Sequence, residues 1–327
     1  MRAAVCRQYG PPEYVNVEED FPAPDLGDGQ VRVRVHAAAV NFPDVLIVAD
    51  KYQMHAAVPF VPGSEFAGVV TEVGAGADEV VIGDRVSGTC FVGAFGEDVV
   101  VLGSALTRVP DGVDDRQAAA FGVAHRTAYH VLRSVARVQP GEHVIVLGAG
   151  GGVGLAAVQL AVVLGATVTA VASTDEKLAA AAQLGATDLV NHRSGALREL
   201  LRGSLPDGAD VVVDPVGGDL SEPALRSLRW GGRFVTVGYA SGEIPRIPLN
   251  LILLKGVHVL GFQFIDFAMH APDELARNER ELLELLATKR IGAHIGALFP
   301  LDDVAGALHY VADGRAIGKV VLDVGRR

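Results

Sequence analysis

The sequence predicts a two-domain α/β protein, with a small β-rich, barrel-like domain and a doubly wound parallel-sheet domain. The chain has 327 residues, and globular domains usually contain about 100–200. The first third alternates short apolar runs with glycine-rich turns, whereas strand patterns alternate with helix patterns after about residue 115. Such alternation is typical of βαβ units and a parallel sheet.

The β-rich part contains one clearly patterned strand. Over residues 30–40, Val31, Val33 and Val35 alternate with polar residues, which is the period of a half-buried strand. Further short apolar runs follow, and no long helical pattern appears before about residue 116. Many short strands separated by glycine-rich turns predict a small barrel-like domain.

The sequence after residue 115 predicts alternating helices and strands. The first helix is expected over 116–136. Near the end of the chain, a helix over 272–289 and a strand near Val320 are expected. The stretch 153–172 could be mistaken for a membrane span, but Gly154 and Gly165 interrupt it and its period changes, so we expect a helix followed by a strand. The predicted strands cover residues 143–147, 167–172, 188–190, 209–214, 233–237 and 258–262, with a further helix over 175–184.

Charge and cysteine content exclude several classes of function. The formal net charge is −11 and no Lys/Arg run appears, which argues against nucleic acid and anionic membranes as partners. Two cysteines make a disulfide framework or a cysteine-rich zinc site improbable, and the ten histidines lack metal-binding spacing. The first residues show no apolar run of signal-peptide type. We expect a cytoplasmic protein.

A glycine-rich loop, Gly148-Ala-Gly-Gly-Gly-Val-Gly154, follows the strand at 143–147 and opens a helix. This is the setting of the dinucleotide-binding fingerprint, in which glycines let the backbone approach a pyrophosphate at the helix N-terminus. Gly151 and Gly154 best fit the close approach and the helix–strand packing. With several βαβ elements around it, the loop predicts dinucleotide binding.

The end of the next strand indicates which dinucleotide binds. NAD enzymes place an acid there for the ribose 2′-hydroxyl, whereas this strand ends in Ser173-Thr174 with Lys177 one turn later. Hydroxyls and a cation suit a 2′-phosphate, so the sequence favours NADPH. Asp175 and Glu176 leave NAD as an alternative, and Ser173 could also be a helix N-cap.

Several segments together resemble a known family over essentially the whole chain. They resemble the zinc-free quinone oxidoreductases, related to zeta-crystallin, within the medium-chain dehydrogenases/reductases. The resemblance implies a GroES-like domain over 1–122 and 266–327 and a Rossmann domain over 123–265, with the cofactor in the crevice between them. The segments that carry it are 41–44, 59–68, 83–86, 127–129, 151–154 and 214–218.

The resemblance also indicates whether the chain has the ligands for a catalytic zinc ion. Zinc-dependent relatives place a cysteine at the position of Asn41, a histidine at that of Ser64 and a third ligand near Val123. None of these three residues is a good zinc ligand, and the relatives' four-cysteine lobe is absent. The chain is therefore expected to hold no metal.

The resemblance implies a set of site residues. Asn41 and Tyr52 are the catalytic candidates. The cofactor-binding candidates are Asn41, Thr127, Gly151, Gly152, Val153, Gly154, Ser173, Lys177, His192, Tyr239, Ser241, Phe262 and Arg315. The chain departs from the family at His192, where a tyrosine is common, and at Asp50, where a glycine is common.

Simpler readings of some of these residues stay open. Asn41 could be a turn residue and Asp44 a helix cap. Tyr52 could simply pack in its loop. His125 and Arg126 could be plain surface residues.

The expected function is NADPH-dependent reduction of quinones or α,β-unsaturated carbonyls without zinc. An enoyl-thioester reductase and a non-catalytic, crystallin-like or regulatory NADPH-binding protein are the alternatives. We also expect a homodimer, because the apolar strand at 258–262 would form an open sheet edge and the resemblance indicates the same. A small-molecule substrate is the expected partner.

Overall fold

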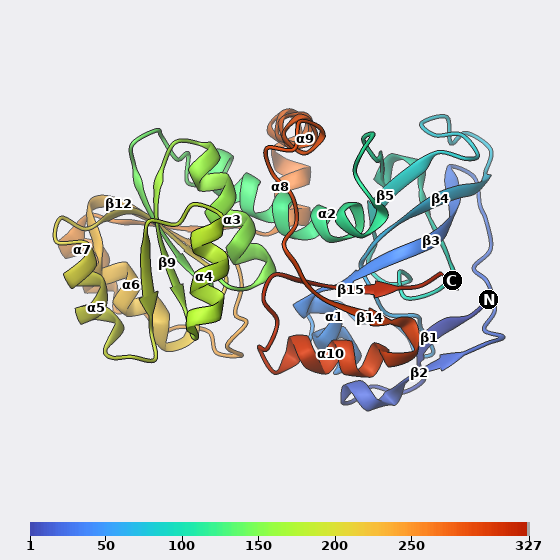
Figure 1. Cartoon of the computed structure of the whole chain (residues 1–327), viewed down its shortest axis with the longest axis horizontal. Coiled ribbons are helices and arrows are strands. Elements are labelled where there is room, and N and C mark those ends of the chain that lie inside the picture. The colour runs from blue at the N-terminus through green and yellow to red at the C-terminus, as the bar shows by residue number, and fades with distance from the viewer. Residues whose placement is uncertain (326–327) are drawn as a thin grey trace. The chain divides into compact units, whose positions relative to one another are not determined.

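The structure is a computed structural model that describes residues 1–325. It divides into two compact units (Figure 1). Unit 1 comprises Met1–Val123 and the chain from Gly292 onward, and unit 2 comprises Ala124–Ile291. The first junction lies one residue from the expected boundary at 122/123, but the return to unit 1 occurs 26 residues after the expected position 266.

Unit 1 is built on a seven-stranded sheet with the order β14-β15-β3-β4-β5-β7, in which β6 also pairs with β3. Neighbouring strands are antiparallel except β14 and β15. A separate antiparallel pair is formed by β1 (Ala3–Cys6) and β2 (Val15–Glu18). The sheet strands are β3 (Gln30–Val40), β4 (Glu65–Val73), β5 (Arg85–Thr89), β6 (Asp98–Leu102), β7 (Leu106–Arg108), β14 (Ile295–Pro300) and β15 (Lys319–Asp323).

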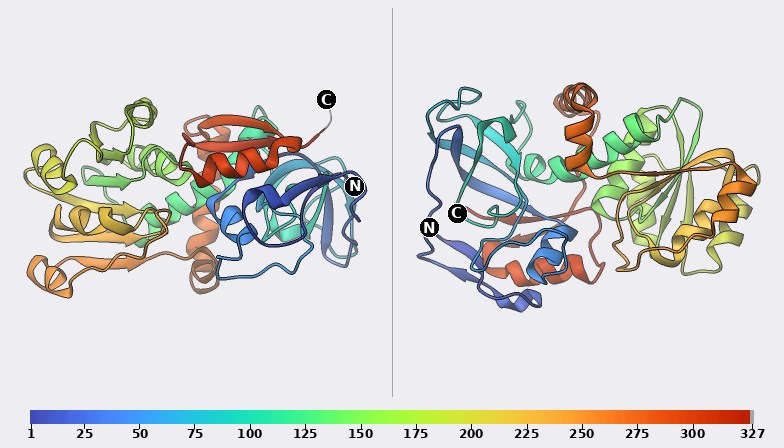
Figure 2. Two further views of the ribbon diagram at one scale, coloured as in Figure 1. Left: turned by 90° about the horizontal axis from the view of Figure 1, so that it is seen from below. Right: turned by 180° about the vertical axis from the view of Figure 1, so that it is seen from behind.

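Strand β3 is central to this sheet, and its alternating pattern is confirmed. Val31, Val33 and Val35 are fully buried in the core of unit 1. Two helices complete the unit: α1 (Phe42–Val48) and α10 (Val304–Ala312). Helix α10 packs beside α1 and along β14 and β15 (Figure 2). The sequence patterns indicated neither α10 nor β14.

Unit 2 is built on a six-stranded parallel sheet with the order β10-β9-β8-β11-β12-β13. Counted along the chain this is the order 3-2-1-4-5-6 of a doubly wound dinucleotide-binding sheet, which confirms the predicted fold class. Strand β13 lies at one edge of the sheet, as expected. The strands are β8 (His143–Leu147), β9 (Thr167–Ala172), β10 (Asp188–Asn191), β11 (Ala209–Asp214), β12 (Leu228–Thr236) and β13 (His258–Gly261).

The helices of unit 2 follow its strands. Helix α3 (Gly152–Val163) is apolar on most of its surface and largely buried. The expectation that residues 153–172 form a helix and then a strand is therefore confirmed. No helix in the described part of the chain is long and apolar enough to cross a membrane. The remaining helices are α2 (Asp115–His130, continued by a π-helix over Val131–Val135), α4 (Asp175–Gln183), α5 (Leu197–Ser204), α6 (Ser221–Arg226), α7 (Leu249–Lys255), α8 (Phe264–His270) and α9 (Pro272–Ala287).

Buried polar contacts assign α9 to unit 2. Asn278 of α9 is fully buried and donates to Nδ1 of the equally buried His130, at 2.9 Å. The Tyr129 hydroxyl lies 2.6 Å from a carboxylate oxygen of Glu281. These contacts between α2 and α9 explain why the unit boundary falls at 291 rather than at 266.

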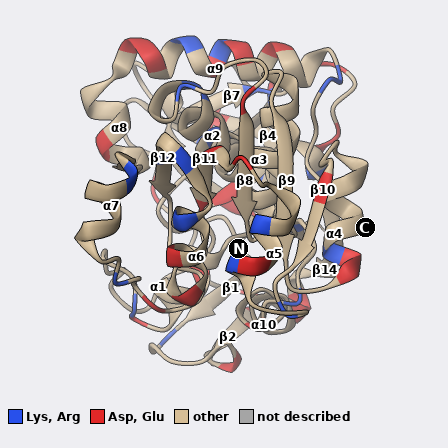
Figure 3. Ribbon diagram, turned by 90° about the vertical axis from the view of Figure 1, so that its left-hand side faces the viewer, with Lys and Arg blue, Asp and Glu red and all other residues tan. Residues whose placement is uncertain are grey.

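Both signs of charge are interspersed along the outer part of α9 (Figure 3).

Candidate functional site

The glycine-rich loop lies between β8 and α3, as predicted. Gly148 has a φ of 61°, a conformation that glycine adopts without strain, and the loop turns there. The N-cap of α3 is Gly151, which has no side chain to accept a hydrogen bond. The first N–H groups of a helix lack intrahelical acceptors and attract anions, so this terminus suits a phosphate.

The glycines of the loop differ in how closely other atoms approach them. A Cβ at Gly154 would lie 2.1 Å from the backbone oxygen of Gly148, so this position requires glycine. A Cβ at Gly151 would lie 3.5 Å from the same oxygen, which is ordinary contact, and would otherwise meet open space. The structure thus assigns close packing to Gly154 and an open approach to Gly151. Gly152 and Val153 form the first turn of α3.

A third glycine, which the sequence analysis did not single out, ties the loop to Lys177. A Cβ at Gly150 would lie 2.4 Å from Cβ and 2.5 Å from Cγ of Lys177. The aliphatic part of Lys177 therefore crosses the loop backbone at this point. Only a residue without a side chain leaves room for this crossing.

The end of β9 brings together the groups predicted for a 2′-phosphate. The Lys177 ammonium lies 3.5 Å from the Ser173 hydroxyl. The N-cap of α4 is Thr174, whose hydroxyl accepts from the Lys177 N–H at 3.3 Å. The reading of Ser173 as the cap is therefore wrong, because the helix begins one residue later.

Two further groups, His192 and Arg193, lie near enough to Lys177 to interact with it electrostatically. Burial lowers the pKa of Lys177 and of His192, and the Arg193 charge lowers both further. Arg193 is a cation that the sequence analysis did not name, although its neighbour His192, after the same strand β10, was a candidate. The carboxylate of Asp175 accepts a hydrogen bond from the Asn191 side chain at 2.9 Å. Asp175 is one of the two acids, with Glu176, that left NAD as an alternative cofactor, and this hydrogen bond occupies its carboxylate.

Tyr239 and Ser241 lie in the loop after β12, against the turn that follows β11. The Ser241 N–H donates to the Val216 carbonyl at 2.9 Å. A Cβ at Gly217 would lie 2.9 Å from a ring carbon of Tyr239. Asp214 holds that turn, since its carboxylate accepts from the backbone N–H groups of Val216 and Gly217, both at 2.8 Å.

The remaining candidates of unit 2 lie near α2. Thr127 is half-buried on α2. The Phe262 ring stacks on His130, with centroids 6.1 Å apart, and packs against Phe267. The reading of His125 as plain surface is wrong, since it is buried.

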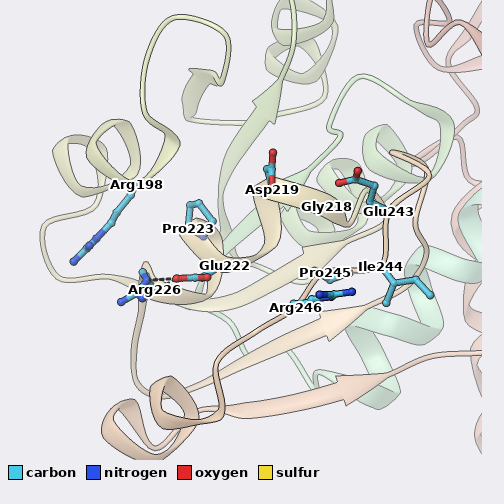
Figure 4. A pocket seen from close by; sticks show the side chains of 10 residues that line it. All are labelled: Arg198, Gly218, Asp219, Glu222, Pro223, Arg226, Glu243, Ile244, Pro245 and Arg246. Atoms are coloured by element: carbon cyan, nitrogen blue, oxygen red, sulfur yellow. Dashed lines mark hydrogen bonds and ion pairs between the residues drawn. The ribbon is translucent and has the colours of Figure 1, made fainter.

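A cavity of about 780 Å³ lies in unit 2 beside Gly218 (Figure 4). Its lining carries arginines and carboxylates in equal number, and Arg226 is paired with Glu222 at 2.7 Å. None of the predicted site residues lines it. The lining residues are Arg198, Gly218, Asp219, Glu222, Pro223, Arg226, Glu243, Ile244, Pro245 and Arg246.

In unit 1, Asn41 belongs to a buried polar network. Its side-chain amide nitrogen lies 3.1 Å from Glu65 Oε2 and 3.4 Å from the Ser64 hydroxyl. Its amide oxygen accepts from the Lys319 ammonium at 2.5 Å, and the same ammonium lies 2.9 Å from Glu65 Oε2. Nothing in the sequence pattern indicated Lys319.

The donors at the positions of the relatives' zinc ligands do not fit a zinc ion. An ammonium already contacts both Asn41 and Glu65, and Val123 contributes only its backbone N–H, which donates to Glu65 Oε1 at 2.7 Å. A metal prefers thiolate, imidazole or carboxylate donors. In the described residues, no group of three or more such side chains is placed to hold a metal.

Asp44 lies in the first turn of helix α1 and is almost fully buried. Its carboxylate accepts from the Asn41 backbone N–H at 2.7 Å, so the helix-cap reading is confirmed. Burial raises the pKa of Asp44 to about 7, and hydrogen bonds from Asn41 and Ser64 and the Lys319 charge lower it only in part.

Tyr52 is half-buried against the core of unit 1. Burial and the nearby Asp44 charge raise the pKa of its hydroxyl. The same two causes raise the pKa of Cys90 to about 12. Tyr52 therefore keeps its proton at neutral pH.

Arg315, the last candidate, lies on the surface of unit 1, where it stacks over Tyr310 and pairs with Asp313 at 3.3 Å.

Asp44 predicts a pH dependence of stability. A carboxyl whose pKa rises from 3.8 to about 7 on folding binds more protons folded than unfolded between those values, so its contribution is full below about pH 4 and is lost as the pH rises to 7. Relative to D44N, the wild-type protein should lose on the order of a few kcal/mol of unfolding free energy over this range. Urea unfolding of both proteins at pH 5 and pH 8 measures this. Parallel pH profiles would contradict it.

Both units match known family models. Residues 27–111 match the alcohol dehydrogenase GroES-like domain, and residues 152–286 match the domain described as zinc-binding dehydrogenase. The first match lies in unit 1 and the second in unit 2.

Whole-length relatives and a solved structure extend this similarity. The chain is 38% identical over 327 residues to a quinone oxidoreductase-like protein 2 homolog of Nematostella vectensis, covering 98% of this chain and 88% of that protein. It is 31% identical over 325 residues to the quinone oxidoreductase of Homo sapiens, covering 98% and 97%. The structure of Escherichia coli quinone oxidoreductase complexed with NADPH matches with a TM-score of 0.90 and 28% identity, covering 99% of this chain and 100% of that chain.

Proposed function

The chain belongs to the zinc-free quinone oxidoreductase branch of the medium-chain dehydrogenase/reductase superfamily, and from this premise we propose that it is an NADPH-dependent oxidoreductase that reduces quinones or α,β-unsaturated carbonyls without zinc. The observation that carries the proposal is the group at the end of β9, where the Lys177 ammonium lies 3.5 Å from the Ser173 hydroxyl. A cation beside a hydroxyl suits a 2′-phosphate, and Asp175, one of the two acids that would suit NAD, accepts a hydrogen bond from Asn191.

The glycine loop supports the same cofactor. Gly151 leaves space beside the N-terminus of α3, and its lack of a side chain permits a pyrophosphate to approach the backbone. When bound, NADPH supplies a hydride from nicotinamide C4. We further propose that Asn41, Thr127, Tyr239, Ser241 and Phe262 contact its nicotinamide end, and that His192 and Arg315 contact its phosphates. Arg193 joins Lys177 in the proposed 2′-phosphate site.

The donor set of unit 1 supports the proposed class of acceptor. Reduction of a simple carbonyl concentrates negative charge on one oxygen, which zinc relatives stabilise by Lewis-acid polarisation. The residues of this chain do not fit a zinc ion, so acceptors that spread charge by conjugation are favoured. The protonated Tyr52 hydroxyl is then suited to donate to the developing quinol or enolate oxygen. Asn41 is less suited to donate, because its amide N–H groups face Glu65 and Ser64.

The proposal predicts a substrate ranking. Purified protein with NADPH should reduce quinones and enones faster than it oxidises simple alcohols with NADP⁺, because conjugation supplies the charge stabilisation. Cofactor oxidation against a panel of quinones, enals, enoyl thioesters and alcohols measures this. Faster alcohol oxidation, or stoichiometric zinc in the active protein, would refute the proposal.

The same panel separates the alternatives. An enoyl-thioester reductase would turn over thioesters well above quinones. An NADPH-binding protein without turnover would bind the cofactor in a calorimeter and reduce none of the acceptors. A cytoplasmic location remains a prediction from composition.

We also propose a homodimer formed through β13. This strand is the last in the sheet, and an open edge can pair with a second copy. Exposed apolar side chains lie on this strand and on α7, the helix that precedes it in the chain: Leu253 and Leu254 on α7 are 82% and 72% exposed, and Val259 on β13 is 43% exposed. A second copy would cover both the unpaired backbone groups and this apolar surface.

Light scattering at micromolar concentration should give twice the mass of the chain. The double variant L253E/L254E should give a monomer, because each carboxylate would lose solvation in the interface. The matched control is L102E, which alters an apolar residue of unit 1 that is 56% exposed and should leave the dimer intact. A monomeric wild-type protein would end this proposal.

A further inference from the structure

A closed network of buried polar groups lies in unit 1. Lys319, Glu65 and Asn41 are 4%, 1% and 8% exposed. They come from β15, from β4 and from the residue before α1. The ammonium reaches both Asn41 Oδ1, at 2.5 Å, and Glu65 Oε2, at 2.9 Å, and the amide nitrogen of Asn41 completes the triangle with Glu65 at 3.1 Å.

Such a network of buried charges contributes little to the free energy of folding. A buried ion pair loses solvation that its attraction barely recovers, and apolar residues of similar size often replace it without loss of stability. What the network does supply is orientation. An ammonium can only donate hydrogen bonds, so its contact with Asn41 Oδ1 fixes which end of the amide faces β15, and the NH₂ end is directed to Glu65.

The Lys319 ammonium lies where the zinc-dependent relatives hold their metal ion. Asn41 stands at the position where zinc-dependent relatives have a metal ligand, and Ser64, the second such position, lies 3.4 Å from Asn41 Nδ2. The zinc relatives hold a divalent cation there, whereas this chain holds a cation on its own side chain. The two cannot share the site, because the ammonium contacts the same oxygens that a metal would need.

We propose that Lys319 is a positioning residue, whose tethered ammonium takes the place of the metal ion and holds the Asn41 amide in one orientation. This inference rests on the proposed function in one respect, namely that Asn41 lies beside the reacting groups. Lys319 contacts no substrate itself and acts through Asn41. Glu65 balances its charge and fixes the opposite end of the amide.

A double-mutant cycle tests this role. K319M should lower kcat with the best quinone acceptor by at least about tenfold, since small misplacements near reacting atoms are costly, and should leave KM for NADPH unchanged. N41A should lower kcat similarly, and K319M in the N41A background should have little further effect. The matched control is R2M, which removes another buried cation of unit 1, paired with Glu19 and Asp302, and should lower stability without changing kcat.

A second variant protects the test from misfolding. K319M leaves Glu65 buried without a cation, whereas K319M/E65Q removes both charges and should fold. The second variant should show the same loss of kcat, because the amide still lacks its ammonium. Its crystal structure should show the Asn41 amide rotated, while the wild-type crystal structure should show Lys319 on Oδ1.

Three results would overturn the inference. These are unchanged kcat in K319M/E65Q or in N41A, additive losses in the cycle, and a zinc ion bound at Asn41 and Glu65 in the purified protein. The amide orientation is read without turnover. A wild-type protein that reduces no acceptor would therefore refute the proposed function, while the crystal structures would still decide whether Lys319 orients Asn41.

Discussion

Replacing Gly154 with alanine is expected to abolish measurable NADPH binding and to destabilise unit 2. The added Cβ would lie 2.1 Å from the backbone oxygen of Gly148, with Ala149 Cα at 2.8 Å. Backbone atoms cannot move aside as the end of a flexible side chain can, so either α3 or the loop must shift. The expected cost is about 3 kcal/mol or more of unfolding free energy, with at least about a hundredfold loss of NADPH affinity.

Two glycine variants of the same unit serve as controls. In G151A the Cβ meets only ordinary contact at 3.5 Å, and the backbone φ of −86° suits alanine, so stability should be unchanged while the methyl group weakens NADPH binding. In G203A, on α5, nothing lies within 4 Å of the added Cβ, and neither property should change. Calorimetric titration and thermal unfolding measure both. A G154A protein that binds NADPH as the wild type does would contradict the loop assignment.

Replacing Lys177 with alanine should raise KM for NADPH by about 10- to 150-fold and leave KM for NADH unchanged. The reason is that a hydrogen bond to a charged group contributes about 1.5–3 kcal/mol, and only NADPH carries the 2′-phosphate. R193A should act in the same direction, since Arg193 lies close enough to lower the pKa of Lys177. Steady-state kinetics with both cofactors measure the two effects.

The control for Lys177 is R202A, which removes an exposed cation of α5 in the same unit. It should change neither Michaelis constant. Equal losses for NADPH and NADH in K177A would mean that Lys177 acts on the loop through its packing over Gly150 and not on the 2′-phosphate.

Local patterns in the sequence predicted most of the strands and helices of the fold. The alternation of Val31, Val33 and Val35 with polar residues indicated β3, because a strand with one buried face alternates, and the expected range 30–40 matches the observed strand. The strand–helix alternation after residue 115 predicted the parallel sheet, and the glycine-rich sequence predicted the loop between β8 and α3. In these segments the physical cause acts within a few neighbouring residues, so the sequence displays it directly.

Local patterns failed where a tertiary contact outweighed them. The N-cap of the helix over Val304–Ala312, Asp303, makes no side-chain cap hydrogen bond, and the helix is stabilised because the core of unit 1 buries Val304, Ala307 and Leu308. The unit boundary at 291 was missed because the buried contact between Asn278 and His130 joins residues 148 positions apart. The N-cap of α4 differed from expectation by one residue, since Ser173 and Thr174 are both good caps.

The sequence by itself therefore determined the doubly wound sheet, the glycine loop, and the choice of Ser173 and Lys177 as candidates for the 2′-phosphate. Only the tertiary structure decided that the Arg193 charge lowers the pKa of Lys177 and that Lys319 meets Asn41, across 278 positions of chain. Periodicity reports which faces of an element are buried, but it does not report which buried faces meet. Two distant polar residues become one network only when a sheet places β15 beside β3, and the cost of burying an unpaired charge then requires each to have its partner.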